Sequence, residues 1–276
     1  MDHALSTHLF VSHRLTSALL TKIQQADIPA VEIFCARQHL DYTDKAQIRE
    51  LGHWFRDSDL KMHSLHSPMY SDEIWGRSGP HALITITEPV KGERLRMVDE
   101  IKRALEIAEY IPFRYLVQHI GVAGEEFDLR KVDAAFSALE QIHLFARARG
   151  VEVLIENTPN DLATAERLLQ FQELTHIGLN YCFDTGHAHM TPGGIAPQFD
   201  LMKERIRSTH VHDNNGKDDG HIFPFAAGGT IEWKAAMELL RSRPGQYPLL
   251  LELKERADAT NQLEPALEAF DRLEQQ

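Results

Sequence analysis

The chain has 276 residues, enough to bury one large hydrophobic core, and its 41 acidic against 29 basic residues give a net charge of −12. The acidic residues are spread along the chain, which disfavours nucleic acid or an anionic membrane as a partner, because phosphate binding requires a basic surface. Two cysteines exclude a disulfide framework, and no apolar stretch approaches ~18 residues, so we expect a cytoplasmic protein without a secretion signal or a membrane span.

Extended and helical patterns alternate along the whole chain. Eight short apolar or alternating segments are predicted to be strands: 4–10, 30–34, 60–66, 114–119, 152–156, 177–183, 208–212 and 248–253. Eight segments with apolar residues at helical spacing are predicted to be helices: 15–26, 44–58, 93–110, 129–149, 161–173, 199–207, 233–241 and 263–274. Strands separated by helices indicate parallel βαβ units, and eight such units predict an α/β fold, a closed (β/α)8 TIM barrel that spans 1–276 as a single domain. A doubly wound open sheet is the alternative.

The most unusual stretch covers residues 208–221, in which three histidines and three aspartates fall within fourteen residues. Ser208, His210 and His212 alternate on one side of a predicted strand, and the chain then enters a polar loop that contains glycine. Neutral imidazole and carboxylate together form the ligand set of a zinc-like divalent ion. A polar loop that simply follows a strand is the other interpretation.

Residues able to bind metal also stand at the ends of most other predicted strands. Six of the eight strands finish on such a residue: His66, His119, Glu156, Asp184 with His187, His210 and Glu252. The carboxyl ends of barrel strands meet on one rim, so these side chains are expected to converge there. Counting by twos predicts that Glu156, Asp184 and Glu252 point into the barrel mouth, where a bound cation would offset the cost of burying their charge.

The most specific motifs then identify a resemblance that covers nearly the whole chain. They are Ile155-Glu156-Asn157, Phe183-Asp184-Thr185-Gly186-His187, His210-Val211-His212-Asp213-Asn214, Asp219-Gly220-His221 and Leu251-Glu252-Leu253-Lys254. With these motifs the chain resembles the xylose-isomerase-like barrel superfamily. That superfamily includes sugar isomerases, ketose 3-epimerases, inosose dehydratases and zinc-dependent abasic-site endonucleases.

The resemblance implies roles for the rim residues. It implies that one divalent ion has four ligands: Glu156, Asp184, His210 and Glu252. Five further residues match positions that complete a three-zinc site in the endonucleases: His66, His119, His187, Asp219 and His221. Zinc and manganese are the leading metals, with magnesium and cobalt as alternatives. The resemblance gives His212 no ligand role, and Glu32 is expected to orient a ligand histidine.

The favoured function is that of a metal-dependent isomerase or epimerase acting on a small polyhydroxy substrate, a sugar or a sugar phosphate. The metal would stabilise an enediolate while Glu156 and Glu252 remove and return a proton, and His187 would bind a substrate oxygen or a second metal. A zinc-dependent phosphodiesterase acting on abasic DNA is the alternative. Arg37 and Tyr70 favour it, whereas the net charge and the absence of a basic run oppose it. An inosose-dehydratase-like lyase and a non-catalytic binding protein remain open.

Two features outside the metal motifs bear on the substrate. The loop 69–92 is longer than a barrel connection requires and is a candidate lid that carries Trp75, a residue able to stack on a sugar. Lys254 is expected either to pair with a carboxylate of the site or to be an ordinary solvated lysine. Related barrels often pair through loops such as 69–92, so a homo-oligomer is one outcome that the sequence leaves open.

Overall fold

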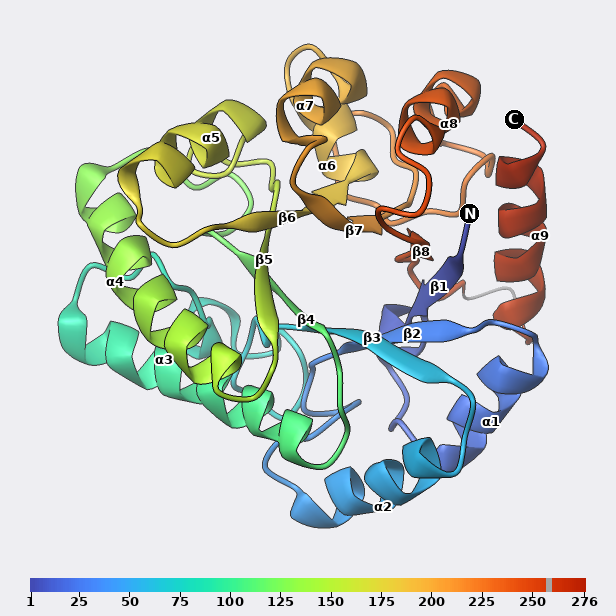
Figure 1. Ribbon diagram of the computed structural model, residues 1–276, viewed down its shortest axis with the longest axis horizontal. Coiled ribbons are helices and arrows are strands. Elements are labelled where there is room, and N and C mark those ends of the chain that lie inside the picture. The colour runs from blue at the N-terminus through green and yellow to red at the C-terminus, as the bar shows by residue number, and fades with distance from the viewer. Residues whose placement is uncertain (257–259) are drawn as a thin grey trace.

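Eight parallel strands form the centre of the molecule (Figure 1). The structure is a computed structural model that describes residues 1–256 and 260–276. In chain order the strands are β1 (His3–Ser6), β2 (Ala30–Phe34), β3 (Lys61–His66), β4 (Tyr115–His119), β5 (Glu152–Glu156), β6 (Asn180–Asp184), β7 (Ile206–His210) and β8 (Leu249–Leu251). Each strand from β1 to β6 pairs in parallel with the next, and β8 pairs in parallel with β1. A parallel bridge between Val211 and Leu251 joins the two ends of the sheet, so the predicted closed (β/α)8 TIM barrel is confirmed.

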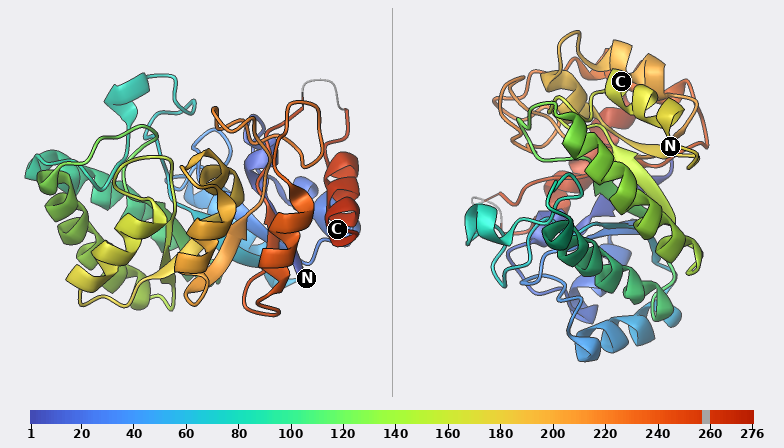
Figure 2. Two further views of the ribbon diagram at one scale, coloured as in Figure 1. Left: turned by 90° about the horizontal axis from the view of Figure 1, so that it is seen from above. Right: turned by 90° about the vertical axis from the view of Figure 1, so that its left-hand side faces the viewer.

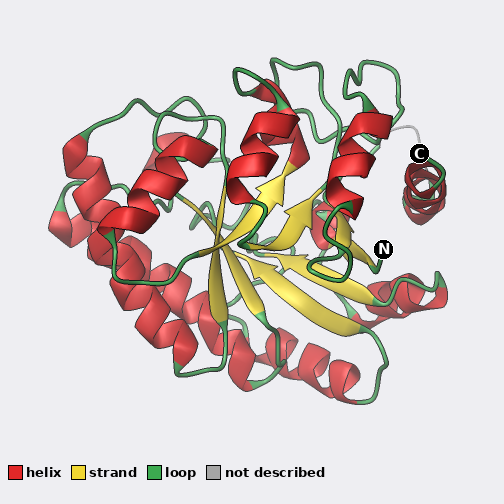
Figure 3. Ribbon diagram, turned by 45° about the horizontal axis from the view of Figure 1, so that its top comes forward, coloured by secondary structure: helices red, strands yellow, loops and turns green. Residues whose placement is uncertain are grey.

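Helices surround the strands on the outside (Figure 3). They are α1 (Ser17–Gln25), α2 (Lys45–Arg56), α3 (Lys91–Leu105), α4 (Leu129–Arg147), α5 (Ala165–Leu174), α6 (Thr185–Met190), α7 (Ile195–Met202), α8 (Trp233–Arg241) and α9 (Leu263–Glu274). Short 3₁₀ turns add η1 (Thr7–Phe10), η2 (Gly79–Ala82) and η3 (Glu106–Glu109). Several helices begin at a side-chain cap, for example Asp44 before α2 and Asp128 before α4, as a helix with free amino-terminal N–H groups requires.

Several predicted boundaries were wrong. The helix predicted at 161–173 begins at Ala165, and the strand predicted at 208–212 lies at Ile206–His210. The first strand ends at Ser6, because Ser6 caps a 3₁₀ turn that occupies the rest of the predicted strand. The sixth strand begins at Asn180, three residues later than predicted. The helix predicted at 199–207 lies at Ile195–Met202, and α6 precedes it as a short helix that the sequence pattern did not reveal.

The two faces of the strands separate as their alternation predicts. Ile155, Phe183 and Leu251 belong to the large core between the sheet and the helices. Leu154 and Cys182 belong instead to a small apolar cluster inside the barrel. Because side chains alternate along a strand, Glu156 and Asp184 lie on the interior side with Leu154 and Cys182.

The loops that follow the strands gather at one end of the barrel. The left view of Figure 2 shows the loop around η2 and the long loop after β7 at the same end of the molecule. The amino group of Met1 forms an ion pair with Glu274, so the two termini lie side by side. No helix in the described part of the chain combines the length and the apolar character that crossing a lipid bilayer requires.

Candidate metal centre

Four strand-end residues bring their side chains together at the mouth of the barrel. Glu156 and Asp184 end β5 and β6, His210 ends β7, and Glu252 follows β8 directly. Their potential ligand atoms all lie within 4.8 Å of one another, and all four residues are buried. The four residues that the resemblance assigned to one ion therefore form one compact cluster, which we call the principal group.

Local hydrogen bonds fix the position of Asp184. Its Oδ1 accepts a hydrogen bond of 2.7 Å from the backbone N–H of His187, so the carboxylate caps the amino terminus of α6. The side chain of Asn157 pairs with the backbone of Asp184 in both directions, at 2.8 and 2.9 Å. The short helix α6 thus holds His187 beside the strand-end aspartate, which explains the spacing of the Asp-Thr-Gly-His motif.

Two atoms in the principal group are buried without a hydrogen-bond partner. They are Glu156 Oε1 and His210 Nδ1, and they lie 3.2 Å apart. Glu252 Oε2 is also 3.2 Å from His210 Nδ1. Buried polar atoms normally find a partner, and a divalent cation bound between a histidine nitrogen and carboxylate oxygens would satisfy both orphaned atoms. The donor set therefore fits a metal ion.

The electrostatics of the principal group couple its carboxylates to its histidines. Burial would raise the pKa of Glu156, but His210 and His119 outweigh burial and hold this pKa well below its ordinary value. Burial would lower the pKa of His210, yet its anionic neighbours, Glu252 and Glu32 among them, raise it well above the ordinary value. The carboxylates thus stay ionised and draw protons onto the histidines. A bound cation would replace those protons.

A second group of ligand atoms lies beside the first. It consists of His187, His212, Asp219 and His221, whose potential ligand atoms also lie within 4.8 Å of one another. Asp219 Oδ2 is 3.1 Å from His187 Nε2 and 3.3 Å from His221 Nε2. Burial alone would lower the pKa of His221, but the hydrogen bond and charge of Asp219 raise it to about 9.

His66 and His119 form a third group with Glu156. Nε2 of His119 is 3.0 Å and Nε2 of His66 is 3.7 Å from Glu156 Oε2, whereas Glu156 Oε1 belongs to the principal group. Each oxygen of Glu156 therefore faces a different cluster of histidines. All nine residues predicted as metal ligands meet at this end of the barrel.

Glu32 supports the principal group from behind, as predicted. Its carboxylate lies 3.1 Å from His210 Nε2, the ring nitrogen opposite the orphaned Nδ1. The hydroxyl groups of Ser6 and Ser64 donate to the same carboxylate at 3.1 and 2.8 Å. This arrangement keeps the Nε2–H of His210 on Glu32 and leaves Nδ1 free to bind a cation.

A cavity of about 240 Å³ opens beside these groups. Glu156, His187 and Glu252 line it on the side of the predicted ligands, and His8, Val11, Phe34, Met69 and Trp75 form an apolar and aromatic wall. Trp75 lies edge-on to Phe34 at 5.2 Å between ring centroids, so the loop predicted as a lid contributes to this wall. The cavity is suited to a small molecule with both polar and apolar surface.

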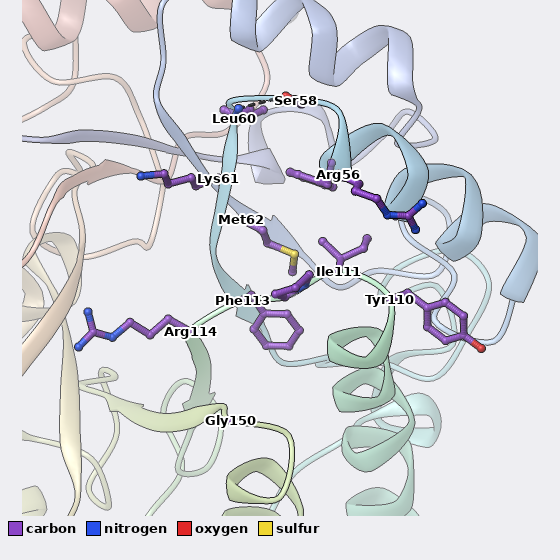
Figure 4. A pocket seen from close by; sticks show the side chains of 13 residues that line it. Arg56, Ser58, Leu60, Lys61, Met62, Tyr110, Ile111, Phe113, Arg114 and Gly150 are labelled. Atoms are coloured by element: carbon purple, nitrogen blue, oxygen red, sulfur yellow. Dashed lines mark hydrogen bonds between the residues drawn. The ribbon is translucent and has the colours of Figure 1, made fainter.

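A larger hollow, of about 690 Å³, lies at the opposite end of the barrel. Figure 4 shows that Met62, Ile111 and Phe113 form its apolar floor. The guanidinium group of Arg56 points away from the charged ends of Lys61 and Arg114, so these cations do not converge on one point. No group of potential metal ligands among the described residues includes a residue of this hollow.

The structure gives two residues a different role from the one expected from the sequence. His212 joins the second group, although the resemblance gave it no ligand role. The sequence signal for this role was its position two residues after His210, which places both side chains on the same side of an extended chain. Arg37, which favoured a nuclease, is held by Asp41 and donates 3.2 Å to the backbone oxygen of Ser71, so it is engaged within the protein.

The fold and the clustered ligands together define a (β/α)8 barrel with a candidate metal centre at the carboxyl ends of its strands. Residues 20–276 match the family model described as xylose isomerase-like TIM barrel, and the chain belongs to this family.

Individual relatives agree with this assignment. The uncharacterized protein MJ1311 of Methanocaldococcus jannaschii is 27% identical over an alignment that covers 96% of this chain and 87% of that protein. Two other curated relatives match over only about half of their own length, 53% in each case.

Solved structures share the fold over nearly the whole chain. A D-tagatose 3-epimerase-like protein is 23% identical with a TM-score of 0.73, and the match covers 100% of this chain and 99% of that one. The IOLI protein with a bound zinc atom is 13% identical with a TM-score of 0.78, covering 99% and 98%. At these identities the likeness shows the fold.

Proposed function

We propose that this protein is a divalent-metal-dependent isomerase or epimerase that acts on a small polyhydroxy carbonyl compound. The observation that carries the proposal is the pair of orphaned buried atoms, Glu156 Oε1 and His210 Nδ1, which face Glu252 next to a cavity sized for a small molecule. The epimerase-like name of one structural relative and the bound zinc of another support the same class of function.

The protein's own residues would perform the proton transfers. A bound divalent cation would supply Lewis-acid polarisation of the substrate carbonyl. Glu156 and Glu252 both line the cavity, from strands on different sides of the barrel mouth. One carboxylate would remove the proton from the carbon beside the carbonyl and later release it to solvent. The other would take a proton from solvent and return it to the other face in an epimerisation or to the neighbouring carbon in an isomerisation. His187, which lines the same cavity, would hold a substrate oxygen.

A zinc-dependent phosphodiesterase is the second candidate. The observation that favours it is the meeting of three ligand groups around Glu156 and Asp184, since several clustered metals can bind a phosphate together. Against it, Lys254 is the single lysine or arginine among the residues that line the cavity, and a DNA duplex requires several such contacts. The small cavity favours a small substrate.

Metal analysis and isotope exchange test this choice. About one tightly bound ion per chain, together with solvent deuterium entering a ketose C–H bond, is the result expected for an isomerase or epimerase. About three ions, with cleavage of abasic DNA and no exchange, would establish the phosphodiesterase. Glu156→Gln is expected to abolish exchange. Circular dichroism would show whether the variant keeps its fold, and retained exchange would remove Glu156 from the mechanism.

A further inference from the structure

Lys254 is the one residue of the cavity lining that carries a permanent positive charge. The other polar lining residues are histidines and the carboxylates of Glu156, Asp219 and Glu252. Lys254 is exposed, and among the described residues no hydrogen bond or ion pair is formed by its ammonium group. A lysine that lines the same cavity as several carboxylates is a feature that the proposed proton transfers do not use.

Backbone hydrogen bonds hold the segment that carries Glu252 and Lys254. The N–H of Glu252 donates to the oxygen of Val211, and the N–H of Lys254 donates to the oxygen of His221 at 2.8 Å. Both amides are thus held by the segment 211–221, and Glu252 and Lys254 line the same cavity.

The neighbours of Lys254 are engaged elsewhere. The carboxylate of Glu255 pairs with Ser12 and with His13, on the other side of the segment. The backbone oxygen of Leu253 lies 3.1 Å from His8 Nδ1, another residue of the cavity wall. The segment is therefore held in place, and Lys254, which lines the cavity, forms no ion pair with another described residue.

The rest of the described lining offers no second lysine or arginine. Val11, Phe34 and Met69 are apolar, Trp75 has one buried indole N–H without a hydrogen-bond partner, and the remaining nitrogen groups are histidines, most of them in the ligand groups. A substrate with one end at the principal group and a negatively charged other end would place that charge next to Lys254. A charge-assisted hydrogen bond to an ammonium group is stronger than a neutral one, and it would favour an anionic compound over its neutral analogue.

We infer that Lys254 is a specificity-determining residue that binds an anionic group, a phosphate or a carboxylate, at the end of the substrate remote from the principal group. This inference rests on the proposed function for the location of the substrate. It narrows the substrate class from polyhydroxy compounds in general to those that carry a terminal anion.

Calorimetric titration of the metal-loaded protein with three related compounds tests the inference without requiring turnover. They are D-ribulose, which is neutral, D-ribulose 5-phosphate and D-fructuronate. The last two carry a phosphate or a carboxylate at the end of the chain remote from the ketone. The wild-type protein is expected to bind at least one of the anionic compounds about 10- to 100-fold more tightly than D-ribulose. The better of the two identifies the anion as phosphate or carboxylate. Equal or weaker binding of both anionic compounds would overturn the inference.

Matched variants assign the preference to Lys254. Lys254→Met is expected to remove the preference and leave D-ribulose binding and metal content unchanged, whereas Lys254→Arg retains most of it. Lys234→Met, on the exposed face of α8, is the control. If Lys254 merely offset the charge of the carboxylates in the lining, Lys254→Met would instead alter the metal content and weaken the binding of neutral and anionic compounds alike. That result would refute the specificity role.

Deuterium exchange separates this inference from the proposed function. Exchange into these compounds without any dependence on Lys254 would leave the isomerase or epimerase proposal standing and overturn the anion site. Binding that depends on Lys254 without exchange into any of the three compounds would support the anion site and count against the proton-transfer function.

Discussion

Replacing Glu32 with Gln tests how the barrel interior prepares His210 for a cation. Glu32 is fully buried and contacts His210 Nε2 at 3.1 Å, while Ser6 and Ser64 donate to the same carboxylate. The substitution removes one negative charge and keeps the size of the side chain. Its effect should therefore report on the contact with His210 and not on packing.

The magnitude follows from the kind of hydrogen bond that is lost. A hydrogen bond to a charged group contributes about 1.5–3 kcal/mol and a neutral one about 1 kcal/mol, so the exchange costs roughly 0.5–2 kcal/mol. Because 1.4 kcal/mol corresponds to a factor of ten, we expect metal affinity to fall about 2- to 30-fold. This range overlaps the effect of about 10- to 100-fold that is typical for residues that orient a metal-binding histidine.

Competition with a chromophoric chelator at pH 7.5 would measure this affinity. Glu264→Gln makes the same chemical change on the exposed surface of α9 and serves as the control. Thermal unfolding of both metal-free variants would show whether the fold is intact. An affinity within twofold of the wild type in a folded Glu32→Gln protein would refute the idea that Glu32 sets the tautomer and charge of His210.

Three further predictions concern the metal, the packing around it and a histidine outside it. Removing the metal with a chelator is expected to lower the melting temperature by roughly 5–10 °C. The reason is that an ion present at about 100 times its Kd stabilises the folded state by about 2.7 kcal/mol. An unchanged melting temperature would argue against a tightly held ion. Gly186→Ala is expected to weaken metal binding and to destabilise the fold by about 1–3 kcal/mol, because an added Cβ would lie 2.0 Å from the ring of His212. A wild-type metal affinity in the same chelator competition would contradict this prediction. His39 is buried away from the ligand groups, and burial lowers its pKa from 6.5 to about 4, so the unfolded chain takes up its proton first as the pH falls. The free energy of unfolding is therefore not reduced by His39 above pH 6.5. It falls by about 3 kcal/mol on account of His39 as the pH is lowered from 6.5 to 4. Denaturant unfolding of wild type and His39→Asn across this range should differ in slope, and parallel pH profiles would show that His39 does not titrate as expected.

The sequence predicted the fold well because the fold depends on periodic patterns. Buried strands such as 152–156 and amphipathic helices such as 233–241 each contain their own signal, and their strict alternation predicts a parallel barrel. Two of the boundaries that failed lie where a local side-chain hydrogen bond decides the outcome. Ser6 turns the chain into a 3₁₀ turn, and Asp184 caps a helix too short to show a period.

The convergence of Glu156, Asp184, His210 and Glu252 was equally predictable, because all four stand at strand ends that a parallel barrel brings to one rim. Their selection as one group came from the resemblance to the family. The tertiary structure alone decided which atoms face one another. It placed the two oxygens of Glu156 between different histidines, brought His212 to Asp219, and left Lys254 unpaired at the cavity edge among the described residues. Periodicity along one strand fixes the side on which a residue lies. Distances between residues of different strands depend on how the closed barrel staggers them, and that stagger arises only when all eight strands have packed together.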